Sequence, residues 1–270
     1  MSSGLVRDLE RIFGRGNVLD SPAARLAYSY DATGIHCDPD CVVFAHGTDE
    51  ISALMRLANK QGFPVVPRGA GTGYTGGSVP VMGGVVLVME RMRRIAGIDE
   101  ENLVLVAEAG VVTSTIHKAA ERVGLFYPPD PASKDVCTIG GNVAECAGGP
   151  RAFKYGVTRN YVLQLEAVLP TGEVFHAGAR TVKSVAGYDM VRLITGSEGT
   201  LAVITRVVLR LVPRPEAMET LLCAFPDPVA AGRAVAATVR EKIVPCTLEL
   251  IDEACVQCVA VSYTHLRAHE

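Results

Sequence analysis

The sequence predicts an α+β fold. Apolar residues first follow a strand, helix, strand order over residues 41–44, 48–61 and 64–67, which is typical of a β-α-β unit. Later apolar runs, at 162–169 and 173–177, are separated by a Thr-Gly turn and predict an antiparallel hairpin. Two glycine-rich stretches, 68–77 and 138–149, interrupt these elements. We therefore expect a β-α-β unit followed by mostly antiparallel strands, with glycine-rich loops between them.

The first 36 residues predict a helical arm. Leu5, Leu9 and Phe13 recur at helical spacing, and Ser21 followed by Pro22 is typical of a second helix start. In the following unit, Thr48 is expected to cap the helix and Gly62 to end it. Strands are then predicted at 85–89 and 103–109.

The middle of the chain predicts a helix, a stiff loop and more strands. Residues 113–123 form the helix, which Gly124 closes, and prolines stiffen the loop at 127–133. A long strand is expected at 201–211. Residues 37–215 are thus predicted to form the main domain.

A second domain is expected to begin after Pro213 and Pro215. The pattern restarts there with a strand at 221–225, a helix at 228–241 and a strand at 247–251, so residues 216–260 are predicted to be its start. Residues 261–270 break the apolar pattern and match an in-frame translation of a sequencing adapter. We therefore interpret them as a non-native tail, on a chain truncated after Ala260. The alternative is a genuine polar tail.

Composition points to a small-molecule partner. The chain has 270 residues, 49% of them hydrophobic, and a formal net charge of -3. This charge argues against a nucleic-acid-binding protein, which needs a basic surface. No apolar run has the length of a membrane span, so we expect a cytoplasmic protein that reaches the inner membrane only through partners. The eight cysteines are expected to be reduced thiols.

The first glycine stretch is predicted to bind an anion. Gly71, Gly73 and Gly76 satisfy a dinucleotide-binding string, but Pro80 and a further strand follow where that motif needs a helix. The stretch also lacks the Gly-Lys-Ser/Thr of a P-loop. Successive backbone N–H groups can instead surround an anion, with Arg68 at the edge as a charged contact. The alternative is a tight structural turn.

The second glycine stretch supplies a complementary surface. Thr138 is expected to cap a helix, while Gly140 and Gly141 leave N–H groups open to a phosphate or a flat ring. Asn142 can both donate and accept hydrogen bonds. The alternative is a helix in which glycine serves packing alone.

At this point an ordered set of motifs resembles a known group. The set includes PRGAGTG at 67–73, TIGGNVAE at 138–145 and GSEGTL at 196–201, with further matches at 30–31, 128–131, 154–158, 181–183, 187–189 and 203–205. Residues 20–260 are similar to the glycolate oxidase large subunit and D-lactate dehydrogenase group. That group belongs to the vanillyl-alcohol-oxidase type (PCMH-type) of FAD-binding flavoproteins.

The resemblance implies noncovalent FAD held between two α/β subdomains, followed by an α+β substrate domain. Residues 68–77 would hold the pyrophosphate, while 129–133 and 138–142 would border the pyrophosphate and flavin. Residues 198–201, with Val203 and Ile204, would lie along the adenosine half. The site residues implied in this way are Arg68, Gly69, Ala70, Gly71, Thr72, Gly73, Gly76, Gly77, Pro129, Asp130, Ser133, Thr138, Gly140, Gly141, Asn142, Glu198, Gly199, Leu201, Val203 and Ile204.

The implied activity is oxidation of a 2-hydroxy acid, such as glycolate or D-lactate, to the 2-oxo acid. Catalytic and metal-binding residues are expected in a C-terminal domain, so none is assigned in this chain. Lys183 and Tyr188 are candidates to approach the flavin, although surface or packing roles fit them better. A downstream electron acceptor or partner subunits are also expected. Two alternatives remain: a noncatalytic flavin-binding subunit of a glycolate oxidase-type complex, and an FAD oxidoreductase acting on another alcohol.

Overall fold

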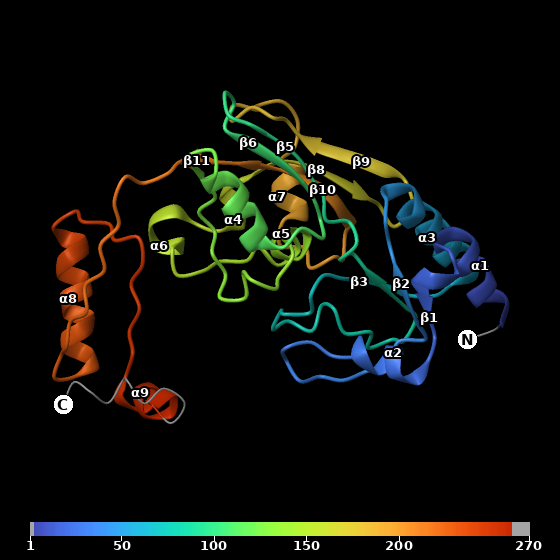
Figure 1. The fold of residues 1–270 in the computed structure, drawn as a ribbon, viewed down its shortest axis with the longest axis horizontal. Coiled ribbons are helices and arrows are strands. Elements are labelled where there is room, and N and C mark those ends of the chain that lie inside the picture. The colour runs from blue at the N-terminus through green and yellow to red at the C-terminus, as the bar shows by residue number, and fades with distance from the viewer. Residues whose placement is uncertain (1–2, 261–270) are drawn as a thin grey trace.

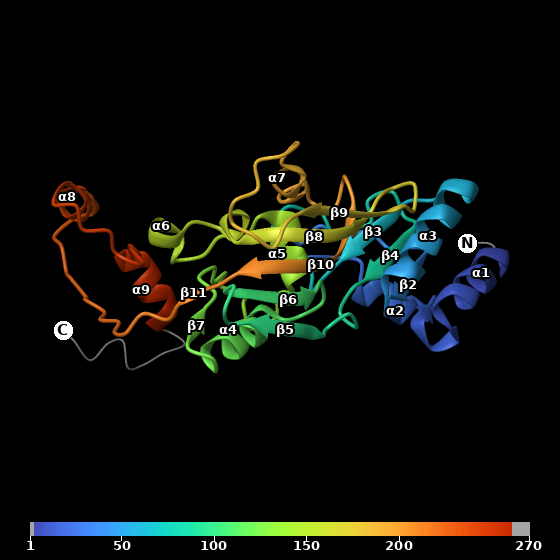
Figure 2. The same ribbon diagram turned by 90° about the horizontal axis from the view of Figure 1, so that it is seen from above.

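The computed structural model describes residues 3–260 and confirms the α+β class. Two sheets lie side by side, and a C-terminal segment extends away from them (Figure 1). The N-terminal helices and the C-terminal helices lie at opposite ends of the molecule (Figure 2). The two sheets therefore form the central body of the described chain.

The first sheet contains four strands in the order β1-β2-β4-β3. They are β1 (Val18–Leu19), β2 (Cys41–Phe44), β3 (Val65–Arg68) and β4 (Val85–Val88), and the last three pair in parallel. Strands β2 and β4 are buried along their whole length, as expected where both faces of a parallel sheet are covered. The helix α3 (Thr48–Gln61) makes the connection from β2 to β3, which confirms the predicted β-α-β unit.

The N-terminal helices are both present. The apolar side of α1 (Ser3–Phe13) places Leu9 and Phe13 in the core of the first sheet. In α2 (Pro22–Ala27), the Ser21 hydroxyl accepts a hydrogen bond from the Ala24 N–H at 3.3 Å, as predicted. A short 3-10 helix, η1 (Arg15–Asn17), precedes β1.

One predicted cap is wrong. The N-cap of α3 is Gly47, and Thr48 is the first helical residue. The Thr48 hydroxyl donates instead to the Glu166 carboxylate. Glu166 is far away in the sequence, so the residues around Thr48 do not predict this hydrogen bond. Gly62 ends the helix in the left-handed conformation (φ 73°), as predicted.

The second sheet contains five antiparallel strands in the order β5-β6-β10-β8-β9. They are β5 (Ile95–Asp99), β6 (Val104–Glu108), β8 (Val162–Val168), β9 (Val174–Gly178) and β10 (Val203–Arg210). Strand β5, an edge strand with a register shift between Ile95 and Gly97, was not predicted. The predicted hairpin of β8 and β9 is confirmed.

Helices cover one face of this second sheet (Figure 1). They are α4 (Thr113–Glu121), α5 (Ile139–Glu145) and α7 (Met190–Ile194), and their apolar side chains share one core with alternate residues of the strands. Smaller elements close the end of the body: α6 (Ala152–Tyr155), η2 (Thr158–Asn160), and the paired β7 (Leu125–Phe126) and β11 (Val212–Pro213).

After β11 the chain leaves the sheets. The helix α8 (Pro228–Arg240) confirms the predicted helix, and the Asp227 side chain caps it by accepting from the Ala230 N–H at 2.7 Å. A second helix, α9 (Glu253–Ala260), follows. The strands predicted at 221–225 and 247–251 are absent from the described part of the chain, because neither segment has a neighbouring strand with which to pair. The division of the chain into domains stays a prediction, and the predicted tail at 261–270 lies outside the described residues.

Candidate cofactor-binding site

The cleft between the two sheets contains a cavity of about 230 Å³. Three segments form its walls: the loop that follows β3, the region from residue 131 to 147, and the turn that leads into β10. Most of the predicted site residues line it, namely Arg68, Gly69, Ala70, Gly71, Thr72, Gly73, Gly77, Ser133, Thr138, Gly140, Gly141, Asn142, Glu198, Gly199, Val203 and Ile204. The fold therefore brings both glycine stretches into one site.

The first glycine loop connects β3 directly to β4, with no helix between them. This confirms that the dinucleotide-binding string is not followed by the helix which that motif requires. Gly71 and Gly76 adopt positive φ angles of 67° and 80°, a conformation that side chains other than glycine rarely take. The loop thus curves around the cavity and presents backbone to it.

The Arg68 side chain packs against the glycine loop, beside Gly71. Its guanidinium is buried, donates to the Tyr30 carbonyl at 2.7 Å and lies 5.6 Å from the ring centre of Tyr28. A Cβ atom on Gly71 would overlap that guanidinium. Burial lowers the Arg68 pKa, although the nearby carboxylates of Asp31 and Glu90 oppose the change. Arg68 is therefore part of the cavity wall, with a hydrogen bond directed away from the cavity.

The second wall is built on α5. Thr138 is the N-cap residue, as predicted, but its side chain makes no capping hydrogen bond. The Thr138 hydroxyl is buried and has no hydrogen-bond partner among the described residues, and a Cβ on Gly69 would overlap it. Asn142 is held inside the protein, where its amide donates to the Thr113 hydroxyl at 2.6 Å. An unpartnered hydroxyl between glycines fits a polar ligand in the cavity.

The third wall is the turn before β10. The backbone N–H of Glu198 donates to the Ala144 carbonyl at 2.9 Å, and that of Gly196 donates to the Val143 carbonyl at 2.9 Å. Glu198 has a positive φ of 54°, which is uncommon for a residue with a side chain. These two bonds attach the turn to the end of α5.

Four predicted residues do not line the cavity. Gly76 faces Ile35, and the Pro129 carbonyl lies 2.8 Å from His117 Nε2. Asp130 forms an ion pair with Arg151 at 3.2 Å, and Leu201 is 42% exposed. These four residues are close in sequence to residues that line the cavity. They nevertheless lie outside the lining, because adjacent residues of a chain face different directions.

Sequence reasoning missed Glu145, the last residue of α5. Its carboxylate lines the cavity and accepts a hydrogen bond from the Thr75 hydroxyl at 3.0 Å. Burial raises the Glu145 pKa; the Thr75 hydrogen bond lowers it in part, and the carboxylates of Glu198 and Asp31 raise it further. The sequence signal that could have identified Glu145 is that it is an acidic residue inside the glycine-rich stretch 138–149. Tyr74 and Pro131, which lie within the predicted segments 68–77 and 129–133, also line the cavity. Lining residues outside the predicted segments are Pro67, Ser78, Met89, Ala109, Cys137, Ala144, Ala147 and Ala202.

Other candidates lie outside the cavity lining. Lys183 is exposed and Tyr188 is 94% exposed, so neither approaches the cavity wall. Within residues 3–260, no group of His, Cys, Asp and Glu has an arrangement that would hold a metal ion. None of the helices described is long and apolar enough to cross a membrane.

The two-sheet fold defines an α+β domain with a glycine-lined cavity between its sheets. Comparison with known families agrees: the FAD binding domain family matches residues 39–178, more than half of the chain. The protein belongs to this FAD-binding family, and FAD is its cofactor. A second family, the C-terminal domain of FAD linked oxidases, matches residues 214–266.

The curated relatives include a glycolate oxidase subunit and a D-lactate dehydrogenase. The chain is 46% identical over 246 residues to the glycolate oxidase subunit GlcD of Bacillus subtilis, covering 91% of this chain and 52% of that protein. It is 41% identical over 236 residues to a D-lactate dehydrogenase of Archaeoglobus fulgidus, covering 86% and 53%. The chain thus spans about half the length of these relatives.

Solved structures support the fold. Alkyldihydroxyacetonephosphate synthase superposes with a TM-score of 0.78 at 24% identity, covering 92% of this chain and 47% of that one. The p-cresol methylhydroxylase superposes with a TM-score of 0.71 at 20% identity, covering 80% and 45%. At these identities the likeness establishes the fold alone.

Proposed function

We propose that this chain is the FAD-holding part of an enzyme that oxidises a 2-hydroxy acid to the 2-oxo acid. The observation that carries the proposal is the glycine-lined cavity between the two sheets, with its unpartnered Thr138 hydroxyl. The relatives named for glycolate oxidation and D-lactate dehydrogenation indicate the class of substrate.

The residues of the cavity suit FAD by their chemistry. Backbone N–H groups of the glycine loop and the hydroxyl of Thr138 are neutral donors for phosphate oxygens. Val203 and Ile204 offer an apolar surface at the start of β10. We propose that FAD binds noncovalently, since the histidines lie outside the described lining and Cys137, which lines it, is buried beside the Thr113 hydroxyl at 3.3 Å.

FAD, when bound, accepts the hydride of the alcohol carbon. The chain's own contribution is to hold the cofactor and to exclude water from one side of it, because its walls are packed backbone and buried side chains. We assign no base to residues 1–260. In this proposal the groups that remove the hydroxyl proton and bind the carboxylate belong to a C-terminal domain that begins at residues 216–260.

Flavin analysis tests this proposal. We expect this chain to be yellow when purified and to release its flavin on denaturation, but to be inactive alone because the catalytic groups lie in the C-terminal domain. Protein extended to include that complete domain should lose flavin absorbance when glycolate, D-lactate or D-2-hydroxyglutarate is added without oxygen. Protein that neither contains FAD nor takes it up would contradict the cofactor assignment. Flavin that all three acids leave oxidised would contradict the substrate class and favour a noncatalytic subunit or another alcohol.

The substitution Thr138→Val tests the site itself. Valine keeps the shape of threonine and removes the unpartnered hydroxyl, so the apoprotein should be at least as stable as wild type. FAD should bind about 3- to 10-fold more weakly, the effect of one lost hydrogen bond. Titration of the apoprotein with FAD, followed by flavin fluorescence, measures this. Unchanged affinity would place the cofactor elsewhere.

Partners and location are also part of the proposal. We propose a cytoplasmic enzyme that passes electrons to a downstream acceptor or partner subunit and meets the inner membrane only through such partners. Fractionation of cells tests this: the protein should follow the membrane fraction only when its partners are present. Membrane binding by the purified protein alone would contradict it.

A further inference from the structure

Three segments of the cofactor site meet at Glu145. The carboxylate lies 3.0 and 3.2 Å from the Thr75 hydroxyl, which belongs to the first glycine loop. The residue before it, Ala144, accepts the backbone N–H of Glu198 from the turn before β10. Glu145 therefore connects the glycine loop of the first sheet to the helix α5 of the second.

Two glycines of the loop allow this contact. A Cβ atom on Gly73 or on Gly77 would lie 3.4 Å from Glu145 Oε1, at the limit of normal packing. The carboxylate thus lies directly against the loop backbone. Because Gly73 and Gly77 have no side chain, Glu145 can come close to the loop. Gly69 lies against Thr138 in the same way, and Gly71 lies against Arg68.

The charges around Glu145 are negative. Glu198 lines the same cavity, and Asp31, which accepts from the Thr33 N–H at 2.9 Å, also acts on the Glu145 carboxyl. The one cation in the described lining, Arg68, donates to the Tyr30 carbonyl. Phosphates placed beside Glu145 would be repelled, whereas a hydroxyl would donate to its carboxylate.

We propose that Glu145 positions the glycine loop and divides the cavity, so that the FAD phosphates lie at the Gly69–Thr138 end and a sugar hydroxyl of FAD donates to Glu145. This inference rests on the proposed FAD site and deepens it. A hydroxyl that donates to a carboxylate favours its ionised form, so binding of FAD releases a proton. Because burial raises the Glu145 pKa, FAD affinity rises with pH as this carboxyl ionises. The groups that face it are Thr75, Glu198 and Asp31.

The test compares Glu145→Gln with wild type by FAD titration of the apoprotein from about pH 5 to pH 8. Glutamine keeps an acceptor for Thr75 but removes the charge. We expect FAD to bind about 10- to 100-fold more weakly to this variant near neutral pH, with a flatter pH profile. The matched control Glu121→Gln changes an exposed carboxylate at the end of α4 and should behave as wild type. Equal or tighter FAD binding by Glu145→Gln would overturn the proposal.

A second variant tests the positioning role. Thr75→Val removes the hydroxyl that holds the loop and leaves the charge, so FAD should bind more weakly while the pH dependence remains. Wild-type affinity in this variant would overturn that role. Titration with FMN and with ADP, each a part of FAD, identifies the hydroxyl that contacts Glu145. If Glu145→Gln weakens binding of FMN, the hydroxyl belongs to the ribityl chain. If it weakens binding of ADP, the hydroxyl belongs to the ribose. Wild-type protein that binds no FAD contradicts the proposed function, whereas FAD binding unaffected by Glu145→Gln contradicts only this inference.

Discussion

Gly140 and Gly141 are adjacent residues of α5, but they have different surroundings. The Gly140 N–H donates to the Ala109 carbonyl at 2.8 Å, and a Cβ there would lie 2.6 Å from the Ala109 Cβ. A Cβ on Gly141 meets only the Thr138 hydroxyl, at 3.4 Å, on the cavity side. The first glycine therefore serves packing of α5 on β6, and the second keeps the cavity open.

Substitution by alanine separates these roles. Gly140→Ala should lower the free energy of unfolding by about 1–3 kcal/mol, because the added methyl overlaps Ala109. Gly141→Ala should raise it by up to about 1 kcal/mol, since alanine favours a helix, and should weaken FAD binding. Urea unfolding and FAD titration measure the two effects. Equal stability of the two variants would contradict the assignment.

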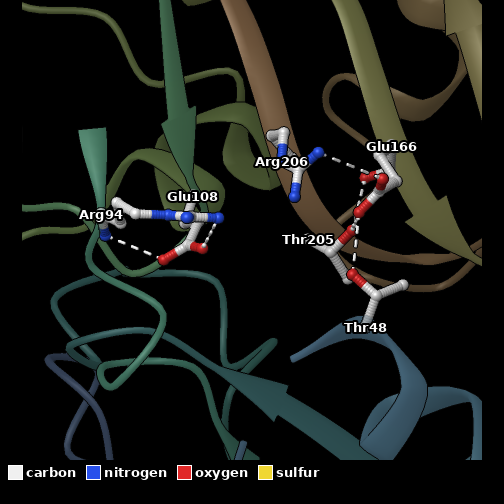
Figure 3. Close-up of polar contacts among 6 residues, drawn as sticks. All are labelled: Thr48, Arg94, Glu108, Glu166, Thr205 and Arg206. Carbon is white, nitrogen blue, oxygen red and sulfur yellow. Dashed lines mark hydrogen bonds and ion pairs between the residues drawn. The ribbon is translucent and has the colours of Figure 1, made fainter. Parts of the chain in front are cut away.

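At the scale of elements, Glu166 connects three of them (Figure 3). From β8 it accepts hydrogen bonds from Thr48 of α3 at 2.8 Å and Thr205 of β10 at 2.7 Å, and it lies 3.7 Å from the Arg206 guanidinium. The first of these bonds attaches α3 of the first sheet to the second sheet. Burial raises the Glu166 pKa, but the hydrogen bonds from both threonines and the Arg206 charge outweigh it, so the pKa is lowered below 4.5.

The substitution Glu166→Gln should lower the free energy of unfolding by about 1 kcal/mol at pH 7, since hydrogen bonds to a charged acceptor are the stronger ones. A lowered pKa means that the carboxylate stabilises the fold above pH 4.5 and loses this effect as pH falls through its folded value. The difference between variant and wild type should therefore disappear in acid. Glu108→Gln is the control, because the ion-pair partner of Glu108, Arg94, is 68% exposed. This variant should lower the free energy of unfolding by less than Glu166→Gln does. A constant difference across pH would refute this role of the charge.

At the scale of the whole molecule, the C-terminal segment has a different character from the two sheets. Its large apolar side chains are exposed, with Leu221 86% and Leu222 95% accessible, whereas β2, β4 and most of β10 are buried. Both ribbon views place α8 and α9 away from the sheets (Figures 1 and 2). We therefore propose that residues 216–260 belong to a domain separate from the FAD-binding part.

Ending the chain after Pro215 tests this separation. The shortened chain should bind FAD with unchanged affinity and unfold at the same urea concentration, because its cores keep their residues. It should bind less of the hydrophobic dye ANS, since exposed apolar side chains are removed. Loss of FAD binding on truncation would show that the segment contributes to the site.

Local sequence determined a large part of this fold. Runs of β-branched residues predicted β2 and β4, Gly62 ended α3, and the Thr171-Gly172 turn set the β8–β9 hairpin, although α4 ends at Glu121 with Arg122, not Gly124, as its C-cap. Each of these depends on residues close together in the chain, whose conformational preferences act without tertiary contacts. The glycine-rich stretches were also visible as ligand loops, because only glycine exposes so much backbone.

Tertiary structure alone decided what the side chains at the site do. Arg68 turns to the Tyr30 carbonyl, Asp130 pairs with Arg151, and Glu145 enters the cavity to meet Thr75. Each partner is distant in sequence, and its position depends on how the chain folds; for Glu145 and Thr75 it depends on how the two sheets pack. The sequence therefore predicted that two glycine loops hold a phosphate-bearing cofactor. Packing decided where the charges of the cleft lie, because hydrogen bonds and ion pairs depend on distances that only the folded chain sets.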